Sequence, residues 1–481
     1  MAKKSPEIID IYGGIAQSKK IGQQGSFRFA RHLNITDDPN DLTLFMAGKK
    51  DSASVVDGLI KWIVDATPYN TKRYAYDANG AIYEINNGTW SKLKTVASSN
   101  GQGLEVHNDY LYYTQNTQIG RYGPLSSAPS FVDNWQTGLN NTSGSKFAPI
   151  TVLNDRMIVG HGNNVATWDG AVWTAEALTL PGELNVRVLS LVDQYVIIGA
   201  WRGNAVTDSE DGYIYTFDGL SDTFNESFPT NGGLNAMQYY RNKLLSIHGH
   251  QGNIYAEVSP FNKIHKVPGV GKQQYLEVYP GAMTTWKELV FFGVSDADSD
   301  SVVRGVYYYG SQSALFHEAL NYILTISTGN TGSSVQIGAV KGIGSDFYMA
   351  WRDGATYGVD KLDSSSSYAL SGTYESLIVD DQRPGEDKRM EAVIINHLPL
   401  ADGESISVAY KKERASDWST GVDAITNSDV GTTETKLYIN PEEQLFREFE
   451  WRTTLNGPGT STPTVIQQKP IYDDLREERK D

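Results

Sequence analysis

The most constraining feature of this sequence is a short hairpin pattern that recurs along most of the chain. Its clearest copy is Tyr110–Gly123, in which two β-prone runs flank a polar Gln-Asn-Thr turn and end just before Pro124. Aromatic and β-branched residues on both sides of a polar turn predict two antiparallel strands. An isolated hairpin is only marginally stable in water, so each copy must belong to a larger sheet.

Seven copies of the hairpin are recognisable, and their spacing is regular. Their first strands begin near residues 74, 110, 157, 195, 244, 289 and 347, which gives intervals of 36–58 residues. Four-stranded propeller blades repeat at about 40–50 residues, whereas a solenoid usually has shorter and stricter repeats, and two sandwiches would not give one period over so long a stretch. The spacing therefore predicts a seven-bladed β-propeller over residues 46–365.

A further apolar run precedes most of the copies. We expect these runs to be the inner strands that line the axis, with each hairpin forming the outer half of its blade. The runs are Leu104–Val106, Ile150–Leu153, Val186–Val192, Leu234–Tyr239, Ala282–Trp286 and Ile337–Val340.

The ring must also close, and propellers commonly close by pairing the two ends of the chain within one blade. Residues 1–45 form an irregular N-terminal arm with one plausible strand, Ser26–Ile35, which could supply the closing strand. The next apolar stretch, Val55–Val64, is compatible with either a helical turn or a buried strand.

The composition changes near Ser364–Ser367, which we interpret as a linker. Residues 366–481 contain six or seven alternating runs between polar turns, a pattern that predicts a β-sandwich. Asn440–Glu443 predicts one short helical turn, because Asn at the N-cap is followed by Pro. The charged tail, Asp473–Asp481, is expected to be solvated or to form an arm on a neighbouring subunit.

Composition supports an all-β protein and excludes several kinds of chemistry. The 28 Tyr and 46 Gly residues favour strands and turns over helices. The chain has no Cys, so disulfides, thiolate zinc sites and Cys nucleophiles are excluded. We expect neither a membrane span nor a secretory signal, because no long apolar run is present and none follows the first residues.

The charge balance bears on nucleic acid binding. There are 41 Lys and Arg residues against 57 Asp and Glu, a formal net charge of −16. Specific binding to DNA is not expected, because phosphate contacts need a basic face. Passage of DNA through an acidic channel would still be compatible with this charge.

Two motifs have the spacing of metal sites but lack the remaining ligands. Asp296, Asp298 and Asp300 match the start of a calcium loop, but Ser301 and Tyr307 stand where Gly and Glu are required. His248 and His250 are two residues apart with no third ligand nearby. We interpret both motifs as polar ends of blades and expect no metal or cofactor.

No catalytic residues can be assigned either. Acidic residues in loops could serve a glycosidase, but the sequence pairs none of them, and the blade-turn box of sialidase-like propellers is missing. Several Trp residues could form a sugar platform, although packing between blades is the more common role of Trp in blade strands. The acidic residues are Asp208, Glu210, Asp211, Asp218 and Asp222, and the aromatic ones are Trp168, Trp173, Trp201, Trp286 and Trp351.

Three parts of the chain share a pattern with a known group of proteins. They are Gly13–Gly22 with Gly25–Phe27 and Leu33–Ile35, the seven Tyr-rich repeats, and Leu400–Tyr410 with Trp418 and Thr462–Ile466. The combination resembles propeller-containing structural proteins of tailed bacteriophage virions. The resemblance implies assembly in several copies, as a nozzle or hub ring or near the tail tip or fibre attachment, and no catalytic turnover.

We therefore expect a non-enzymatic virion protein of a phage tail, made in the host cytoplasm, whose partners are other tail proteins and further copies of itself. The alternative is a propeller that binds or cleaves a host-surface glycan during attachment. A third hypothesis is an intracellular scaffold that gathers partners, since a fold alone does not fix a function. Any functional residues should lie in the irregular loops, above all Arg202–Gly212 and Ser295–Ser301.

Overall fold

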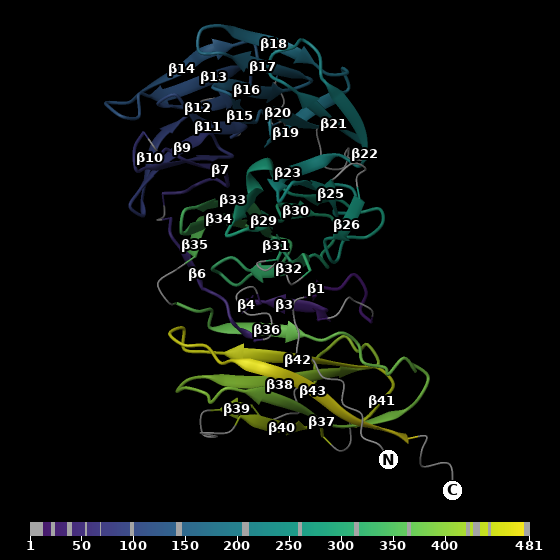
Figure 1. Ribbon diagram of the computed structural model, residues 1–481. Helices are drawn as coiled ribbons and strands as arrows, with labels where there is room; N and C mark the ends of the chain where they lie inside the picture. The colour runs from purple at the N-terminus through teal and green to yellow at the C-terminus, as the bar shows by residue number, and fades with distance from the viewer. Residues whose placement is uncertain are drawn as a thin grey trace. The chain divides into compact units, whose positions relative to one another are not determined.

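The computed structural model shows a chain built almost wholly from short antiparallel strands (Figure 1). It describes residues 13–20, 25–35, 41–52, 55–67, 69–96, 101–140, 147–203, 211–257, 262–311, 317–362, 367–419, 424–426, 433–440 and 444–475. Two compact units are present: unit 1 comprises residues 1–48, 307–325 and 362–481, and unit 2 comprises residues 49–306 and 326–361. Most of the predicted linker, most of the loop after Gly203, the predicted helical turn after Asn440 and the end of the charged tail lie outside the described residues.

Seven four-stranded antiparallel sheets make up the repeats, which we number as blades 1–7. Blade 1 is β7 (Ile60–Asp65), β8 (Arg73–Asp77), β9 (Ala81–Asn86) and β10 (Thr89–Thr95). Blade 2 is β11 (Gly103–His107), β12 (Tyr110–Gln115), β13 (Gln118–Gly123) and β14 (Ser130–Thr137). Blade 3 is β15 (Ile150–Leu153), β16 (Arg156–His161), β17 (Asn164–Trp168) and β18 (Trp173–Thr179). Blade 4 is β19 (Leu184–Val192), β20 (Tyr195–Arg202), β21 (Asp211–Phe217) and β22 (Glu226–Asn231).

The remaining blades follow in chain order. Blade 5 is β23 (Leu234–Tyr240), β24 (Lys243–His248), β25 (Asn253–Glu257) and β26 (Asn262–Lys266). Blade 6 is β28 (Met283–Trp286), β29 (Leu289–Gly293), β31 (Val306–Gly310) and β32 (Ala319–Leu324). Blade 7 is β33 (Val335–Ile343), β34 (Asp346–Asp353), β35 (Thr356–Leu362) and β6 (Gly48–Lys50).

The first strands of the blades form a closed circle within unit 2. Each contacts the first strand of the next blade, in the order β7, β11, β15, β19, β23, β28 and β33, and β33 contacts β7 again. The fold is therefore a seven-bladed β-propeller, as the repeat spacing predicts, and the apolar runs are its inner strands.

Tyrosines of the hairpins fill the space between blades. Between blades 1 and 2, the rings of Tyr76 and Tyr113 lie 6.1 Å apart in an edge-to-face arrangement, within a cluster that also contains Tyr74 and Leu111. The Tyr113 hydroxyl donates to Asp133 at 2.6 Å. A pair of tyrosine rings between blades removes a large apolar area from water, while the hydroxyl groups still form hydrogen bonds. This explains why a repeat that cannot fold alone is rich in Tyr.

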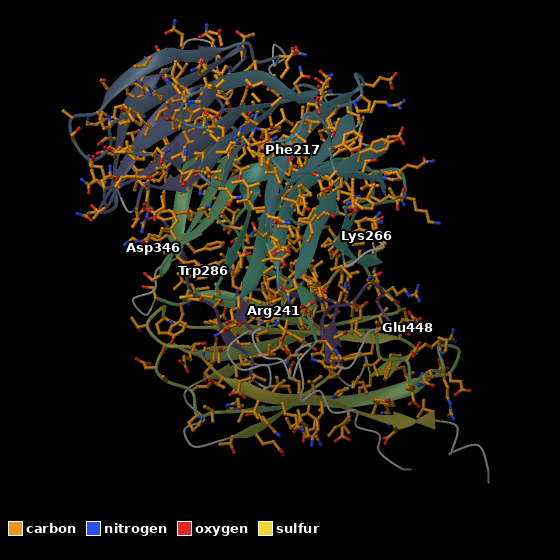
Figure 2. The ribbon with its side chains drawn as sticks, turned by 45° about the horizontal axis from the view of Figure 1, so that its top comes forward. Phe217, Arg241, Lys266, Trp286, Asp346 and Glu448 are labelled. Carbon is orange, nitrogen blue, oxygen red and sulfur yellow. The ribbon has the colours of Figure 1, made fainter. Side chains whose placement is uncertain are left out.

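Other blade contacts combine aromatic rings and ion pairs. Trp286 of blade 6, labelled in Figure 2, packs against Phe347 of blade 7 with ring centres 5.1 Å apart. Asp346, at the start of β34, accepts from Arg73 of blade 1 at 2.7 Å and from Lys361 of its own blade at 2.9 Å (Figure 2). Such contacts tie the last blade to the first.

The predicted place of the hairpin within its blade is wrong. Tyr110–Gly123 forms β12 and β13, the two middle strands, and β14 is the outermost strand of the blade. The residues of β14 alternate between exposed and half-buried. They therefore lack the apolar run that marks the other strands in the sequence.

The predicted ring-closing strand is also wrong. Ser26–Ile35 breaks into three short pieces, β2 (Ser26–Phe27), β3 (Phe29–Arg31) and β4 (Leu33–Asn34), which pair outside the propeller. The fourth strand of blade 7 is β6, and the Asp51 amide donates to Val359 beyond its end. Three residues with two exposed lysines give almost no strand signal, so the sequence does not reveal them.

Unit 1 contains the sheets of the C-terminal region, where we expect a β-sandwich. One sheet has the order β3, β36 (Ser371–Glu375), β42 (Phe449–Asn456), β38 (Ser405–Lys412) and β39 (Ile425–Thr426). In the other, β37 (Lys388–His397) pairs with β40 (Glu434–Tyr438), β41 (Leu445–Phe446) and β43 (Val465–Asp474). The two sheets contact each other: Trp451 donates to Gln468 at 3.0 Å, and the rings of Phe446 and Phe449 lie 5.4 Å apart.

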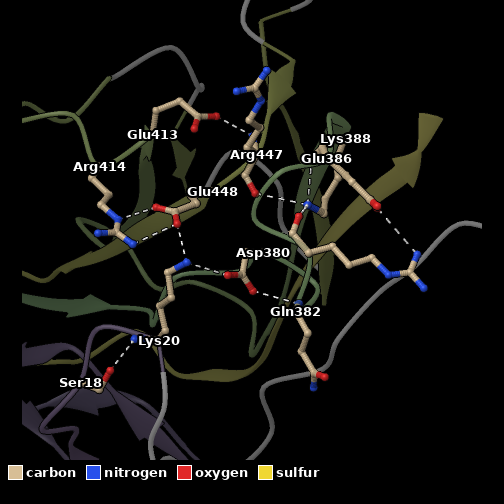
Figure 3. Close-up of polar contacts among 11 residues, drawn as sticks. Ser18, Lys20, Asp380, Gln382, Glu386, Lys388, Glu413, Arg414, Arg447 and Glu448 are labelled. Carbon is tan, nitrogen blue, oxygen red and sulfur yellow. Dashed lines mark hydrogen bonds and ion pairs between the residues drawn. The ribbon is translucent and has the colours of Figure 1, made fainter. Parts of the chain in front are cut away.

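The N-terminal arm is part of unit 1. Besides β3, it supplies β1 (Gly14–Ile15), which pairs with β2, and β5 (Thr43–Leu44), which pairs with β4. The Lys20 ammonium contacts Asp380 at 2.8 Å and also Glu448, which Arg414 holds from its other side (Figure 3). Hydrogen bonds from Arg414 and Lys20 lower the pKa of Glu448 to about 2. The arm is therefore anchored by charge as well as by strand pairing.

Ring closure predicts that Ser52 is important for stability. The buried Val359 amide donates to the Ser52 hydroxyl at 2.9 Å. Ser52→Ala should leave that amide without a partner and lower the free energy of unfolding by about 1–3 kcal/mol in urea titrations. Ser91→Ala, at an exposed position on β10, is the control and should change little. Equal effects of the two substitutions would contradict this account of the closure.

Candidate functional site at the propeller axis

Four of the inner strands carry a β-bulge near their first residues. The bulges fall between Ile60 and Trp62 in β7, Val186 and Val188 in β19, Leu234 and Ala236 in β23, and Ile337 and Val340 in β33. The extra residues in the first three are Lys61, Arg187 and Asn235. A bulge re-aims a side chain at the cost of regular pairing, and bulges are frequent beside functional sites.

A segment that we call the axial segment, residues 276–282, meets these bulges. It consists of β27 (Leu276–Glu277), Val278, Tyr279 and the 3-10 turn η2 (Pro280–Ala282). The turn contacts β7, β23 and β33, which belong to blades 1, 5 and 7. Gly281 is required here because a side chain would collide with the Lys61 carbonyl. The segment therefore lies on the inner side of the ring, against the inner strands of blades 1, 5 and 7.

Arg187 is bound on three sides. Its Nη2 atom donates to Glu277 of the axial segment at 2.7 Å, and the side chain is only 3% exposed. Its guanidinium carbon lies 4.1 Å from the ring centre of Trp201 and 4.6 Å from that of Phe147. Burial lowers the pKa of Arg187 while the Glu277 carboxylate opposes that effect.

Lys61 is held differently, because aromatic rings rather than a carboxylate surround its ammonium. Its Nζ atom lies 5.0 Å from the ring centre of Phe147 and 5.3 Å from that of Tyr279. Burial lowers the pKa of Lys61 to about 8, although Glu277 favours the charged form from a longer distance. The Lys61 ammonium forms no hydrogen bond or ion pair within the described part of the chain.

Two buried polar atoms at this site have no hydrogen-bond partner among the described residues. They are Nε of Arg187 and Oδ1 of Asn235. Asn235 is completely buried, and its amide nitrogen donates to the Leu276 carbonyl of the axial segment at 2.6 Å. Buried polar atoms are almost always paired, so two unpaired ones beside an unpaired lysine mark this as the candidate site.

The Ser295–Ser301 loop, which we singled out as irregular, holds the axial segment in place. Its strand β30 (Asp296–Ala297) pairs with β27, and Ser295 forms hydrogen bonds with both Glu277 and Tyr279. Asp298 accepts from the Tyr275 amide at 3.0 Å. Within the described residues no group of three or more His, Asp or Glu side chains could hold a metal ion. Asp296 and Asp298 thus contribute to the structure of the loop.

The histidine pair is divided between two environments. His248 is completely buried on β24, where its ring nitrogens contact the Ser246 hydroxyl at 3.0 Å and the Asn231 carbonyl at 3.2 Å. His250 instead lies against Tyr275, with ring centres 5.6 Å apart. The two imidazoles thus have separate partners.

The acidic and aromatic candidates are mostly dispersed. Asp218 accepts from the amides of Leu220 and Ser221 and stabilises its own turn, while Asp211 and Asp222 are exposed; Asp208 and Glu210 lie outside the described residues. Trp201, Trp286 and Trp351 are buried. Trp168 and Trp173 are half-buried beside Trp135, whose ring centre is 4.9 Å from that of Trp168 and 6.4 Å from that of Trp173.

The residues at the axis were missed in the sequence, although a weak signal existed. Arg187 and Asn235 interrupt runs that we predict as inner strands, and Lys61 lies in the stretch Val55–Val64. A charged or amide residue within a buried run has to find a partner. The sequence does not show that three such residues from different blades converge on one segment.

Comparisons with known proteins add only distant structural similarity. No family model matches the chain, and no curated protein matches its sequence. The WD40 β-propeller domain of Doa1 is similar over 67% of this chain and 99% of its own, with 10% identity and a TM-score of 0.43. YCF48 from Cyanidioschyzon merolae covers 66% of this chain and 98% of its own at 11% identity and a TM-score of 0.43.

A longer match extends over both units. The extracellular domain of the putative hybrid two-component system BT3049 from B. thetaiotaomicron covers 92% of this chain and 61% of its own, with 11% identity and a TM-score of 0.46. As for membranes, the described residues contain no helix with the length and apolar character needed to span one.

Lys61 should lower the free energy of unfolding at neutral pH. Its folded pKa of about 8 lies below the unfolded value of 10.5, so folding is penalised while the lysine is charged, and the penalty fades as the pH rises from 8 to 10.5. Lys61→Met should therefore raise the free energy of unfolding at pH 7 by about 1 kcal/mol, after allowance for the lost cation–π contacts and the partial exposure of the side chain. Lys287→Met, which removes an exposed lysine over Trp286, is the control. A clear loss of stability in Lys61→Met would contradict this account.

His248 should make stability depend on pH in the acidic range. Burial lowers the pKa of His248 to about 4, below the unfolded value of 6.5. The contribution of the neutral imidazole to the free energy of unfolding is therefore complete above pH 6.5 and is lost as the pH falls towards 4. The loss should be about 3 kcal/mol at most. Urea titrations of wild type and His248→Gln across this range should give a smaller slope for the variant. Parallel slopes would show that His248 does not titrate as described.

Proposed function

We propose that this chain is a non-enzymatic structural protein of a tailed bacteriophage virion. It would assemble in several copies in the tail, at the nozzle or hub, the tail tip or the fibre-attachment region, after synthesis in the host cytoplasm. The basis is the resemblance of the N-terminal arm, the Tyr-rich repeats and the C-terminal strands to such proteins. Its partners would be other tail proteins and further copies of the chain.

The observation that carries this proposal is the exposed apolar surface at one sheet edge of unit 1. Strands β40 and β41 both pair with β37 and form that edge. Their residues Tyr438 and Leu445 are each 60% exposed. Exposed strand edges with large apolar side chains invite pairing with another chain, so natural proteins usually protect them or use them as interfaces.

The anchoring of the N-terminal arm is consistent with a static role. Strand β3 extends the sheet of β36, and the Leu42 and Val465 backbones are bridged, so unit 1 combines both ends of the chain.

A glycan-binding role is the second candidate, favoured by the tryptophan cluster of blades 2 and 3. Trp135, Trp168 and Trp173 are half-buried neighbours, and Arg121 lies 5.3 Å from the ring centre of Trp135. Aromatic faces with an adjacent charged group can bind sugar rings. A glycan array with wild type and Trp173→Ala tests it, and absence of binding by wild type would remove this candidate.

Mass spectrometry of purified virions from the host culture tests the main proposal. We expect the chain in intact particles in several copies per virion, and its absence from them would contradict the proposal. The interface is tested separately with Tyr438→Lys/Leu445→Lys, which should shift the purified protein from oligomer to monomer in light scattering. Leu220→Lys, at a propeller residue that is 76% exposed, is the control and should leave the oligomer intact.

A further inference from the structure

The site at the propeller axis has the composition of a binding site for a small anion. We infer that Lys61, Arg187, Asn235 and Tyr279 form a site for a small ligand that carries one carboxylate with a hydroxyl or N–H donor beside it. The site goes beyond the proposed structural function and does not depend on it.

The first argument is the positive charge without a partner. Lys61 and Arg187 bring two positive charges to this site, and Glu277, which Arg187 binds at 2.7 Å, brings one negative charge. The buried Asp77 also attracts Lys61, but only through space, because its carboxylate accepts hydrogen bonds from other groups. Among the described residues the ammonium of Lys61 forms no hydrogen bond or ion pair, and it lies near the rings of Phe147 and Tyr279. Transferring a lysine from water into such surroundings is unfavourable unless an anion compensates it.

The second argument is the pair of unused hydrogen-bonding atoms on buried residues. Nε of Arg187 can donate to a carboxylate, and Oδ1 of Asn235 can accept from a hydroxyl or N–H group. Both side chains are fixed by the axial segment, because Glu277 holds Arg187 and the Leu276 carbonyl holds Asn235. A donor and an acceptor in fixed positions specify a ligand that has both functions.

The third argument concerns access and ligand size. Lys61, Glu277 and Tyr279 are partly exposed, whereas Arg187, Asn235, Phe147 and Trp201 are buried, so the more open side of the site is the one that Lys61, Glu277 and Tyr279 form. The ring of Phe147 lies 5.6 Å from that of Tyr279 and offers an apolar wall. Glu277 disfavours a second negative charge on the ligand, so a monocarboxylate is preferred over a phosphate dianion.

The fourth argument is that β-bulges direct three of these side chains to the axial segment. Lys61, Arg187 and Asn235 come from blades 1, 4 and 5, and each is the extra residue of a bulge in an inner strand. Strand irregularity at three separate positions, all directed to one segment, indicates selection for a site rather than a local packing accident.

Calorimetry with D-glucuronate as the probe tests the inference at constant ionic strength, with D-glucose and inorganic phosphate as comparison compounds. Full-length wild type should bind glucuronate saturably and gain thermal stability with it, while glucose, which lacks the carboxylate, should do neither. Lys61→Met should weaken glucuronate binding at least about tenfold, the effect of roughly 1.4 kcal/mol. Lys287→Met should bind like wild type.

A second variant distinguishes a specific loss of binding from a loss of binding caused by misfolding of Lys61→Met. Tyr279→Phe keeps the ring and removes only the hydroxyl, which can donate a hydrogen bond to a carboxylate. A folded protein is therefore expected, with weaker glucuronate binding than wild type. Absence of saturable glucuronate binding by wild type, equal binding by Lys61→Met, or tighter binding of phosphate than of glucuronate would each overturn the assignment. None of these results depends on whether the chain is found in virions.

Discussion

Closure of the ring is the constraint on which the rest of the propeller depends. Each blade buries its faces only against its neighbours, so one missing contact would expose two blades at once. The chain meets this requirement at several levels. The inner strands β33 and β7 contact each other, Asp346 pairs with Arg73, and β6 completes blade 7 before the chain enters blade 1. The apolar and aromatic surfaces between blades can then be buried without an exposed end.

At the propeller axis, the closed ring brings residues from different blades together. Seven inner strands bring residues far apart in sequence close together, and a segment inserted between blades 5 and 6 contacts the inner strands of blades 1, 5 and 7. Bulges sacrifice regular pairing to direct Lys61, Arg187 and Asn235 towards it. A charged lysine held by rings, and buried atoms without partners, lower stability. Proteins commonly accept such costs at binding sites, because the ligand supplies the missing partners.

Much of the fold was predictable because it rests on local signals that repeat. Seven hairpins at a steady spacing identify the propeller, and the apolar runs identify six inner strands correctly. Prediction failed where the local signal is weak. Strand β14 has no fully buried residue, and β6 is three residues long with two exposed lysines. Ser26–Ile35 has a good strand signal, but its partner is β36, about 340 residues away, which no local pattern can indicate.

The sequence by itself determined the all-β class, the number of blades, the absence of cysteine chemistry and the acidic charge. Composition and repeat spacing can be read along the chain without knowledge of which distant residues are in contact. It also placed the irregular loop Ser295–Ser301 among the features worth attention. Only the tertiary structure decided which strand closes the ring and what that loop holds. The tertiary structure alone also decided the axial site. Each of its residues is ordinary within its own strand, and Lys61, Arg187 and Asn235 form a site only because the closed ring and the axial segment bring them together.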